Sequence, residues 1–140
     1  MVTININILV ENVNQLKESV KKCDMSEDEF IVYTGSTALT LYGIMVENFI
    51  QPLTIVNLIG LLDEDLNSDS YQMFYTYQKL SQNEYIICND IKITTPRRAI
   101  KDLVMINNVN DIYELEDCIE GTEWEEVYKE VKKELGVLNE

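Results

Sequence analysis

A strand, turn and strand pattern that leads directly into a helix start constrains the fold more than any other part of the sequence. Two short apolar runs, Tyr85–Cys88 and Ile91–Thr94, flank Asn89–Asp90, and both of these turn residues tolerate a positive φ. Thr95 and Pro96 then provide a helix N-cap and a first helical residue. The apolar face of this helix consists of Ala99, Ile100, Leu103 and Val104. We therefore predict a two-residue β-hairpin followed directly by a helix.

The first third of the chain predicts two strands and two helices. Residues 2–10 alternate apolar and polar side chains, which predicts a short strand, and from there to Cys23 the apolar residues recur at helical spacing. The apolar run Phe30–Tyr33 predicts a buried strand. After it, Gly35 is expected to form a tight turn and Ser36 to cap a second helix.

The remaining elements are strands before the hairpin and helices after it. Leu53–Leu62 and Tyr71–Tyr77 are rich in β-branched or aromatic residues, as is typical of strands. Asp111–Ile119 predicts a helix, and a capping-box pattern at Thr122–Glu125 predicts the start of a last one. This order predicts an α+β fold in one domain over residues 1–140, with a mixed or antiparallel sheet covered by helices and a helical C-terminus.

The net charge of the chain and the types of side chain it contains exclude several kinds of chemistry. The chain has 140 residues, of which 25 are acidic and 11 basic, a formal net charge of −14 and no histidine. Because this field repels phosphate backbones and anionic lipid, neither nucleic acid nor a membrane is expected as a direct partner. Cys23, Cys88 and Cys118 lack a histidine that would activate a thiolate or complete a zinc site, and they favour a reducing cytoplasm. No cofactor and no metal site is predicted.

Residues Phe30–Ile44 combine a strand, a Gly-Ser turn and a helix. This segment resembles the opening of the nucleotidyltransferase fold, including toxins of the AbiE class. In that family the turn holds nucleotide phosphates, which implies Gly35 and Ser36 as nucleotide-binding residues if the protein is an enzyme. The resemblance also implies two metal-binding acids on the next strand. That strand, Leu53–Ile59, carries no carboxylate, so an inactive relative is the better interpretation.

A second motif follows the hairpin and consists of Ile93, Thr94, Pro96, Arg98 and Asp102. With the helix and strand before it, this block is similar to the C-terminal domain of AbiEi-type (type IV) antitoxins, over roughly residues 33–118. In that family the domain engages a cognate toxin or supports DNA binding by a winged helix in front of it, which implies a toxin–antitoxin role in phage defence. The same residues also suit a structural role, as a helix start with a local ion pair.

Acidic residues gather late in the sequence, where we expect a partner to bind. The predicted binding residues are Asp63, Glu64, Asp65, Asp69, Glu116, Glu120, Glu123, Glu126 and Glu130. An ordinary solvated helix face would also account for those in the last helices.

The favoured hypothesis is a non-enzymatic, antitoxin-like inhibitor that neutralises a basic partner, which either handles nucleic acid or transfers nucleotides. Two alternatives stay open. One is an active minimal nucleotidyltransferase that uses Ser36 with Asp63 and Asp65. The other is an acidic mimic of nucleic acid directed at a defence or restriction enzyme.

Overall fold

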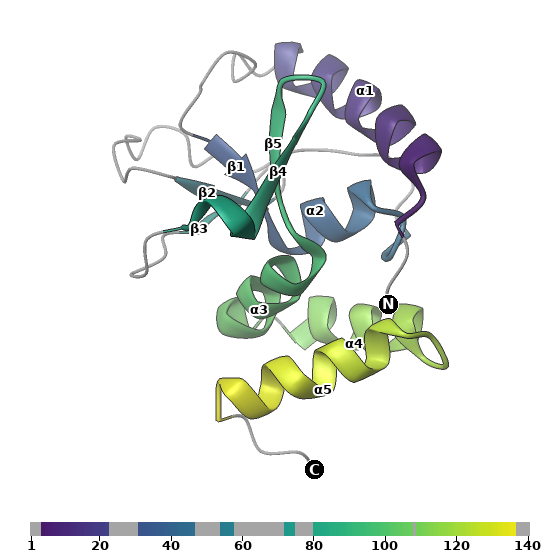
Figure 1. The fold of residues 1–140 in the computed structure, drawn as a ribbon, viewed down its shortest axis with the longest axis vertical. Coiled ribbons are helices and arrows are strands. Elements are labelled where there is room, and N and C mark those ends of the chain that lie inside the picture. Colours follow the sequence, from purple (N-terminus) through teal and green to yellow (C-terminus); the bar gives the residue numbers. More distant parts are fainter. Residues whose placement is uncertain are drawn as a thin grey trace.

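The computed structural model describes residues 4–22, 31–46, 54–57, 72–74, 80–107 and 109–136. Its elements follow the order α1 (Ile6–Lys22), β1 (Ile31–Tyr33), α2 (Gly35–Leu41), β2 (Thr54–Asn57), β3 (Gln72–Phe74), β4 (Tyr85–Cys88), β5 (Ile91–Thr94), α3 (Pro96–Ile106), α4 (Val109–Ile119) and α5 (Trp124–Glu134). A 3-10 turn precedes β4. Figure 1 shows the sheet beside α1 and α2, with α3, α4 and α5 stacked at the other end. The predicted α+β class with a helical C-terminus is confirmed.

Strand β1 lies in the centre of a five-stranded sheet with the order β3-β2-β1-β5-β4. It pairs antiparallel with β2 and parallel with β5, so the sheet is mixed. The parallel pair joins Tyr33 to Ile93, which are 60 positions apart in the chain. The strands predicted at Phe30–Tyr33, Leu53–Leu62 and Tyr71–Tyr77 contain β1, β2 and β3, and the rest of the two longer predictions lies outside the described residues.

The hairpin of β4 and β5 has the predicted turn. Asn89 and Asp90 have φ values of 47° and 69°, the left-handed conformation that a two-residue turn of this kind requires at both positions. Thr95 then caps α3, because its hydroxyl oxygen accepts a hydrogen bond from the backbone N–H of Arg98 at 3.4 Å, and Pro96 is the first helical residue. Both predictions for this segment are confirmed.

The N-terminal segment is helical where its alternating pattern predicts a strand. The strand prediction for residues 2–10 is wrong from Ile6 onward, since α1 begins there. The buried face of α1 includes Leu9, Val13 and Leu16. The side-chain oxygen of Asn5 accepts a hydrogen bond from the backbone N–H of Ile8 at 3.2 Å. Burial of this face and the cap outweigh the β propensity of the isoleucines, and Ile6 and Ile8 remain 62% and 41% exposed.

The start of the last helix also differs from its prediction. The N-cap of α5 is Glu123, which makes no side-chain capping bond, so the predicted capping box is wrong. The hydroxyl of Thr122 instead donates to the carbonyl of Ile119 at 2.6 Å, and the carboxylate of Glu125 accepts from the backbone N–H of Gly121 at 3.0 Å. Because Gly121 has a φ of 76°, the chain reverses there, and these side chains stabilise the turn between α4 and α5.

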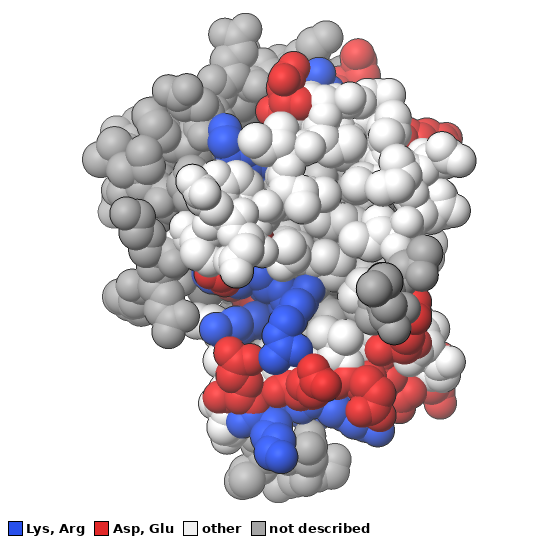
Figure 2. All heavy atoms as spheres, viewed as in Figure 1, with Lys and Arg blue, Asp and Glu red and all other residues white. Residues whose placement is uncertain are grey.

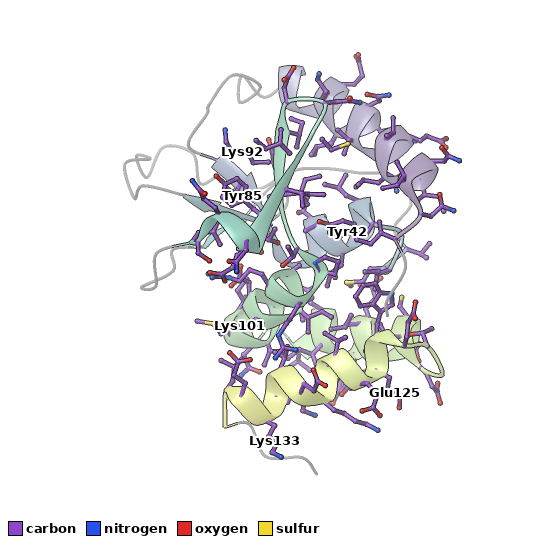
Figure 3. All side chains as sticks on the ribbon, in the orientation of Figure 1. Tyr42, Tyr85, Lys92, Lys101, Glu125 and Lys133 are labelled. Atoms are coloured by element: carbon purple, nitrogen blue, oxygen red, sulfur yellow. The ribbon has the colours of Figure 1, made fainter. Side chains whose placement is uncertain are left out.

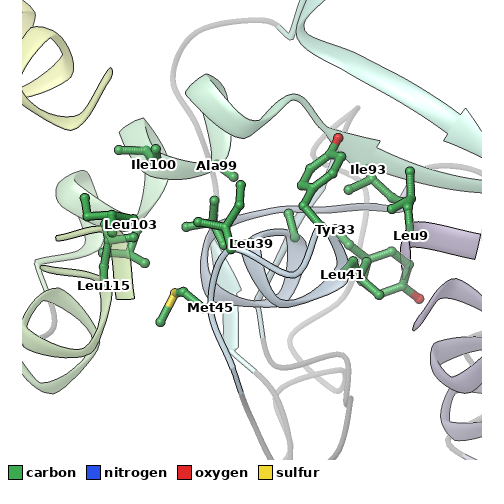
Figure 4. Packing of buried hydrophobic residues seen from close by; sticks show 14 of the residues in the cluster. Leu9, Tyr33, Leu39, Leu41, Met45, Ile93, Ala99, Ile100, Leu103 and Leu115 are labelled. Atoms are coloured by element: carbon green, nitrogen blue, oxygen red, sulfur yellow. The ribbon is translucent and has the colours of Figure 1, made fainter. Parts of the chain in front are cut away.

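Helix α2 lies at the centre of the hydrophobic core. It packs against α3, and α3 packs in turn against α5. Figure 4 shows Leu39 of α2 between Tyr33 on one side and the α3 residues Ala99 and Leu103 on the other. The largest fully buried side chains are Leu16, Leu39, Leu41, Met45, Ile93, Ile100, Leu115 and Ile119. The core therefore joins α1, α2, the sheet and the C-terminal helices.

Gly43 follows α2 and has a backbone conformation that residues with a side chain rarely adopt. Its φ is +79°, and a Cβ atom placed there would lie 3.1 Å from Cγ2 of Ile8. We expect Gly43→Ala to lower the free energy of unfolding by about 1–3 kcal/mol, measured by urea denaturation. Gly121→Ala is the control, because its φ is +76° but nothing lies within 4 Å of its Cβ position. Equal losses in the two variants would contradict a contribution from the Ile8 contact.

Candidate functional site

Thr34, the residue before the Gly-Ser turn, meets the Thr94–Asp102 block inside the protein in one buried polar network. The hydroxyl of Thr34 donates to Oδ2 of Asp102 at 2.6 Å, and the hydroxyl of Thr94 donates to Oγ1 of Thr34 at 2.9 Å. Nε of Arg98 donates to Oδ1 of Asp102 at 2.8 Å. The two threonines and Asp102 are 0% exposed and Arg98 is 3% exposed, so these groups are shielded from water.

The fold explains why these four residues meet. Strands β1 and β5 are parallel neighbours, and Thr34 and Thr94 lie at their carboxyl ends, at the same edge of the sheet. Arg98 and Asp102 are four residues apart on α3 and therefore lie on one face of that helix. A buried charge without a partner costs several kcal/mol, whereas here each carboxylate oxygen accepts a hydrogen bond. The network thus fastens α3 to the sheet.

Glu84 extends the network toward the surface. Nη1 of Arg98 donates to Oε2 of Glu84 at 2.7 Å, and Ser81 donates to Oε1 through its backbone N–H and its hydroxyl. Burial alone would raise the pKa of Glu84, but the hydrogen bonds from Arg98 and Ser81 lower it. Burial raises the pKa of Asp102, although Thr34 and Arg98 act in the opposite direction. For the basic side chain of Arg98 burial acts in the other direction and would lower the pKa. The carboxylates of Asp102 and Glu84 raise this pKa, so the guanidinium stays charged.

The residues predicted to bind nucleotide lie in this buried region. Ser36 is 5% exposed, and Gly35 is buried as well. The N-cap of α2 is Thr34, so the prediction that Ser36 caps this helix is wrong. Gly35 has a φ of 56° and already belongs to α2, which moves the helix start ahead of Ser36. A nucleotide phosphate could reach Ser36 only if the surrounding side chains moved.

The C-terminal acidic residues lie on α4, on α5 and on the turn between them. Residues 109–136 carry ten carboxylates and three lysines, a net charge of −7, which is half of the −14 of the whole chain. Figure 2 shows a band of acidic side chains across this end of the molecule. Of the predicted binding residues, Glu116 lies on α4, Glu120 and Glu123 lie on the turn, and Glu126 and Glu130 lie on α5. The other predicted binding residues, Asp63, Glu64, Asp65 and Asp69, lie outside the described residues.

Part of this negative charge is neutralised within the protein. Arg97 of α3 forms ion pairs with Glu130 and Glu134 of α5, each at 2.9 Å, and Nζ of Lys101 lies 3.4 Å from Glu134. Basic side chains accordingly lie beside the acidic band in Figure 2. Glu130 therefore helps to hold α5 against α3, a structural role that its place in the sequence did not indicate.

A hollow of about 370 Å³ lies between α4 and α5. Its lining consists of Glu116, Ile119, Glu120, Glu125, Tyr128, Lys129 and Lys132. The hydroxyl of Tyr128 donates to Glu116 at 2.9 Å, and Nζ of Lys132 lies 4.8 Å from the centre of the Tyr128 ring. Burial raises the pKa of Tyr128, and Glu116 raises it further. Figure 3 shows Glu125 near the α4–α5 turn. With both carboxylates and ammonium groups in its wall, this hollow favours neither sign of charge.

Three carboxylates on α4 and at the start of the turn after it differ from those above. Glu114, Asp117 and Glu120 are exposed, and within the described stretches none of them forms an ion pair. No ion pair in these stretches therefore neutralises their charge, although Glu120 shares the wall of the hollow with Lys129 and Lys132. Glu114 and Asp117 are not among the predicted binding residues, although their spacing from Glu120 in the sequence could have suggested them.

Comparison of the chain with protein-family models, with curated proteins and with solved structures gave no match. Among the helices of the described stretches, none combines the length and apolar character that crossing a bilayer requires. In the same stretches no three Cys, Asp or Glu side chains are grouped as a metal site would need. The function is therefore inferred from the geometry and charge of the chain itself.

Proposed function

We propose that this protein is a non-enzymatic, antitoxin-like inhibitor that binds a basic protein partner through its acidic α4–α5 surface. This surface is defined by the exposed carboxylates Glu114, Glu116, Asp117, Glu120, Glu123 and Glu126. The observation that carries the proposal is the uncompensated charge of Glu114, Asp117 and Glu120 on a segment with a net charge of −7. Such a surface attracts a positively charged partner and raises its rate of association.

The partner that fits this surface is a protein that handles nucleic acid or transfers nucleotides. Proteins of this class carry Lys and Arg where they contact phosphates, so their working surface is complementary to the α4–α5 surface. Occupying that surface would inhibit them, which is the action that the resemblance to AbiEi-type antitoxins implies. The free thiols of Cys88 and Cys118 suit the cytoplasm as the proposed location.

The arrangement of polar residues supports binding rather than catalysis. Asp102 and Arg98, which are the best positioned charged groups for chemistry, are buried and bonded to each other. Their contacts join α3 to the sheet, and the one partly exposed carboxylate in this network, that of Glu84, is held by Arg98 and Ser81. The exposed charge lies at the other side of α3, on α4, on α5 and on the turn between them, where a large partner has access.

The test is capture from host lysate on the immobilised protein, followed by binding measurements with each captured protein. Each exposed charge pair contributes about 0.2–1 kcal/mol, so we expect Asp117→Asn/Glu120→Gln to weaken binding roughly tenfold. We also expect salt to weaken binding, because screening shortens the range of the attraction. The matched control is Glu11→Gln/Asp90→Asn, which removes the same charge from α1 and the hairpin turn and should change affinity less than twofold.

Three outcomes would contradict the proposal. One is an equal loss of binding affinity in the two double variants, which would show that only the net charge of the protein matters and not the position of the carboxylates. Another is binding that does not depend on salt. The third is transfer of label from a nucleotide to cell RNA in the presence of Mg²⁺ or Mn²⁺, lost in Ser36→Ala, which would identify an enzyme. Competition by duplex DNA for the captured protein would instead favour the nucleic-acid mimic as the form of inhibition.

A further inference from the structure

Helix α4 presents an outer face that is apolar at one end and acidic at the other. Val109 and Tyr113 are 58% and 66% exposed and lie four residues apart, one turn from each other on the same side of the helix. Asp117 continues this side four residues beyond Tyr113. Glu120, the first residue after the helix, follows three residues later at the rim of the hollow, and both carboxylates are exposed. We call the row formed by Val109, Tyr113, Asp117 and Glu120 the outer row of α4.

The opposite side of α4 holds the helix in the core. Leu115 and Ile119 are 0% and 1% exposed, and Ile112 packs against the core cluster. The position of α4 therefore does not depend on the outer row. An exposed tyrosine in this setting contributes little to folding, because few of its atoms are removed from water. The outer row can thus be changed without unfolding the protein.

A third exposed apolar side chain lies just before the outer row in the sequence, on α3. Met105, four residues before Val109 and near the end of α3, is 42% exposed. Exposed apolar side chains mark a contact surface where they are neighbours on the surface, as Val109 and Tyr113 are on α4. Tyrosine is also one of the residues that most often dominate binding energy, since its ring buries a large area and its hydroxyl stays hydrated.

We infer that the outer row docks an amphipathic segment of the basic partner, with an apolar side chain against Tyr113 and Val109 and Lys or Arg side chains against Asp117 and Glu120. The inference rests on the proposed function. It adds Tyr113 as the anchoring side chain, and it adds the chemistry of the partner segment that binds there. Charge complementarity selects this occupant: a second copy of the chain would bring its own carboxylates to the same row and be repelled. The acidic residues supply orientation, and the tyrosine supplies buried area.

The probe is a synthetic 18-residue helical peptide with one stripe of leucine flanked by lysine, and the control probe has glutamine in place of the leucines. Binding of the labelled peptide to the whole protein is followed by fluorescence anisotropy. We expect Tyr113→Ala to weaken binding of the leucine probe about tenfold and Tyr113→Phe to weaken it less than twofold. Ile87→Ala is the matched control, since Ile87 is 63% exposed on β4, and it should leave binding unchanged.

The outcomes separate this inference from the function on which it rests. If Asp117→Asn/Glu120→Gln weakens binding of both probes while Tyr113→Ala weakens neither, the acidic surface binds basic partners but the tyrosine anchor is refuted. If neither variant weakens binding, both the anchor and the proposed surface fail. Equal binding of the leucine and glutamine probes would also overturn the anchor. Thermal unfolding of each variant at the wild-type temperature verifies that lost binding is not lost folding.

Discussion

Replacing Asp102 by alanine is expected to lower the free energy of unfolding by about 3–5 kcal/mol, because it breaks a buried ion pair. The substitution removes the carboxylate that pairs with Arg98, whose side chain is only 3% exposed and so keeps a buried charge with one partner fewer. It also leaves the Thr34 hydroxyl without the acceptor that it contacts at 2.6 Å. Urea denaturation at pH 7 measures the loss.

The neighbouring arginine provides the control for this prediction. Arg97 pairs with Glu130 and Glu134, but its side chain is 49% exposed. Exposed ion pairs contribute little, so Arg97→Ala is expected to cost at most about 1 kcal/mol. A second variant, Arg98→Met/Asp102→Leu, removes both buried charges and is expected to be more stable than Asp102→Ala alone. Similar losses for Asp102→Ala and Arg97→Ala would contradict the structural role of the buried pair.

Leu39→Ala is expected to destabilise the protein by about 2–5 kcal/mol, because it opens a cavity where α2 contacts α3. Leu39 is 0% exposed and lies between Tyr33 and the α3 residues Ala99 and Leu103 (Figure 4). Neighbouring backbone cannot close such a cavity easily, since α2 is surrounded by the sheet, α1 and α3. Equilibrium unfolding in urea gives the difference in free energy.

Leu39→Met distinguishes lost volume from any other effect of changing this residue. Methionine fills a similar volume and adapts its shape, so its cost is expected to stay below about 1.5 kcal/mol. If Leu39→Met costs as much as Leu39→Ala, the site tolerates no change of shape, and the cavity is not the cause. If both variants cost less than about 1 kcal/mol, α2 is not the centre of the core.

Local patterns predicted those elements whose formation depends on their own residues. The hairpin follows from Asn89–Asp90, and the start of α3 follows from Thr95 and Pro96, because turn and cap preferences are properties of a few adjacent side chains. The N-terminal segment was harder to predict. Its isoleucines favour a strand locally, but burial of Leu9 and its neighbours against the core decides for a helix.

The candidate site was predictable only in part, for the same reason. The acidic character of the last helices is visible in the sequence, whereas the pairing of Glu130 with Arg97 depends on how α5 packs on α3. The network of Thr34 with Asp102 joins residues 68 positions apart. No local pattern reveals such a contact. The two resemblances drew attention to the segments around Gly35 and Asp102 without indicating that Thr34 and Asp102 are in contact.

The buried block also changes the meaning of one resemblance. Thr94, Pro96, Arg98 and Asp102 belong to the block that resembles the antitoxin family in sequence. In this structure Pro96 is the first residue of α3, and the other three form the network that joins α3 to the sheet. A block of this kind can mark a shared scaffold, whatever the scaffold binds. Under the proposed function, the specificity of this protein then lies in the exposed residues of α4 and α5, which the block does not include.

The central position of β1 has a consequence for synthesis of the chain. Its parallel neighbour β5 pairs Tyr33 with Ile93, so 60 further residues must be added before that pair can form. At about 5–20 residues per second, this takes roughly 3–12 s on the ribosome. During that interval the side of β1 that later binds β5 has no strand from its own chain to pair with. Timely folding therefore depends on keeping this edge from other nascent chains until the hairpin emerges.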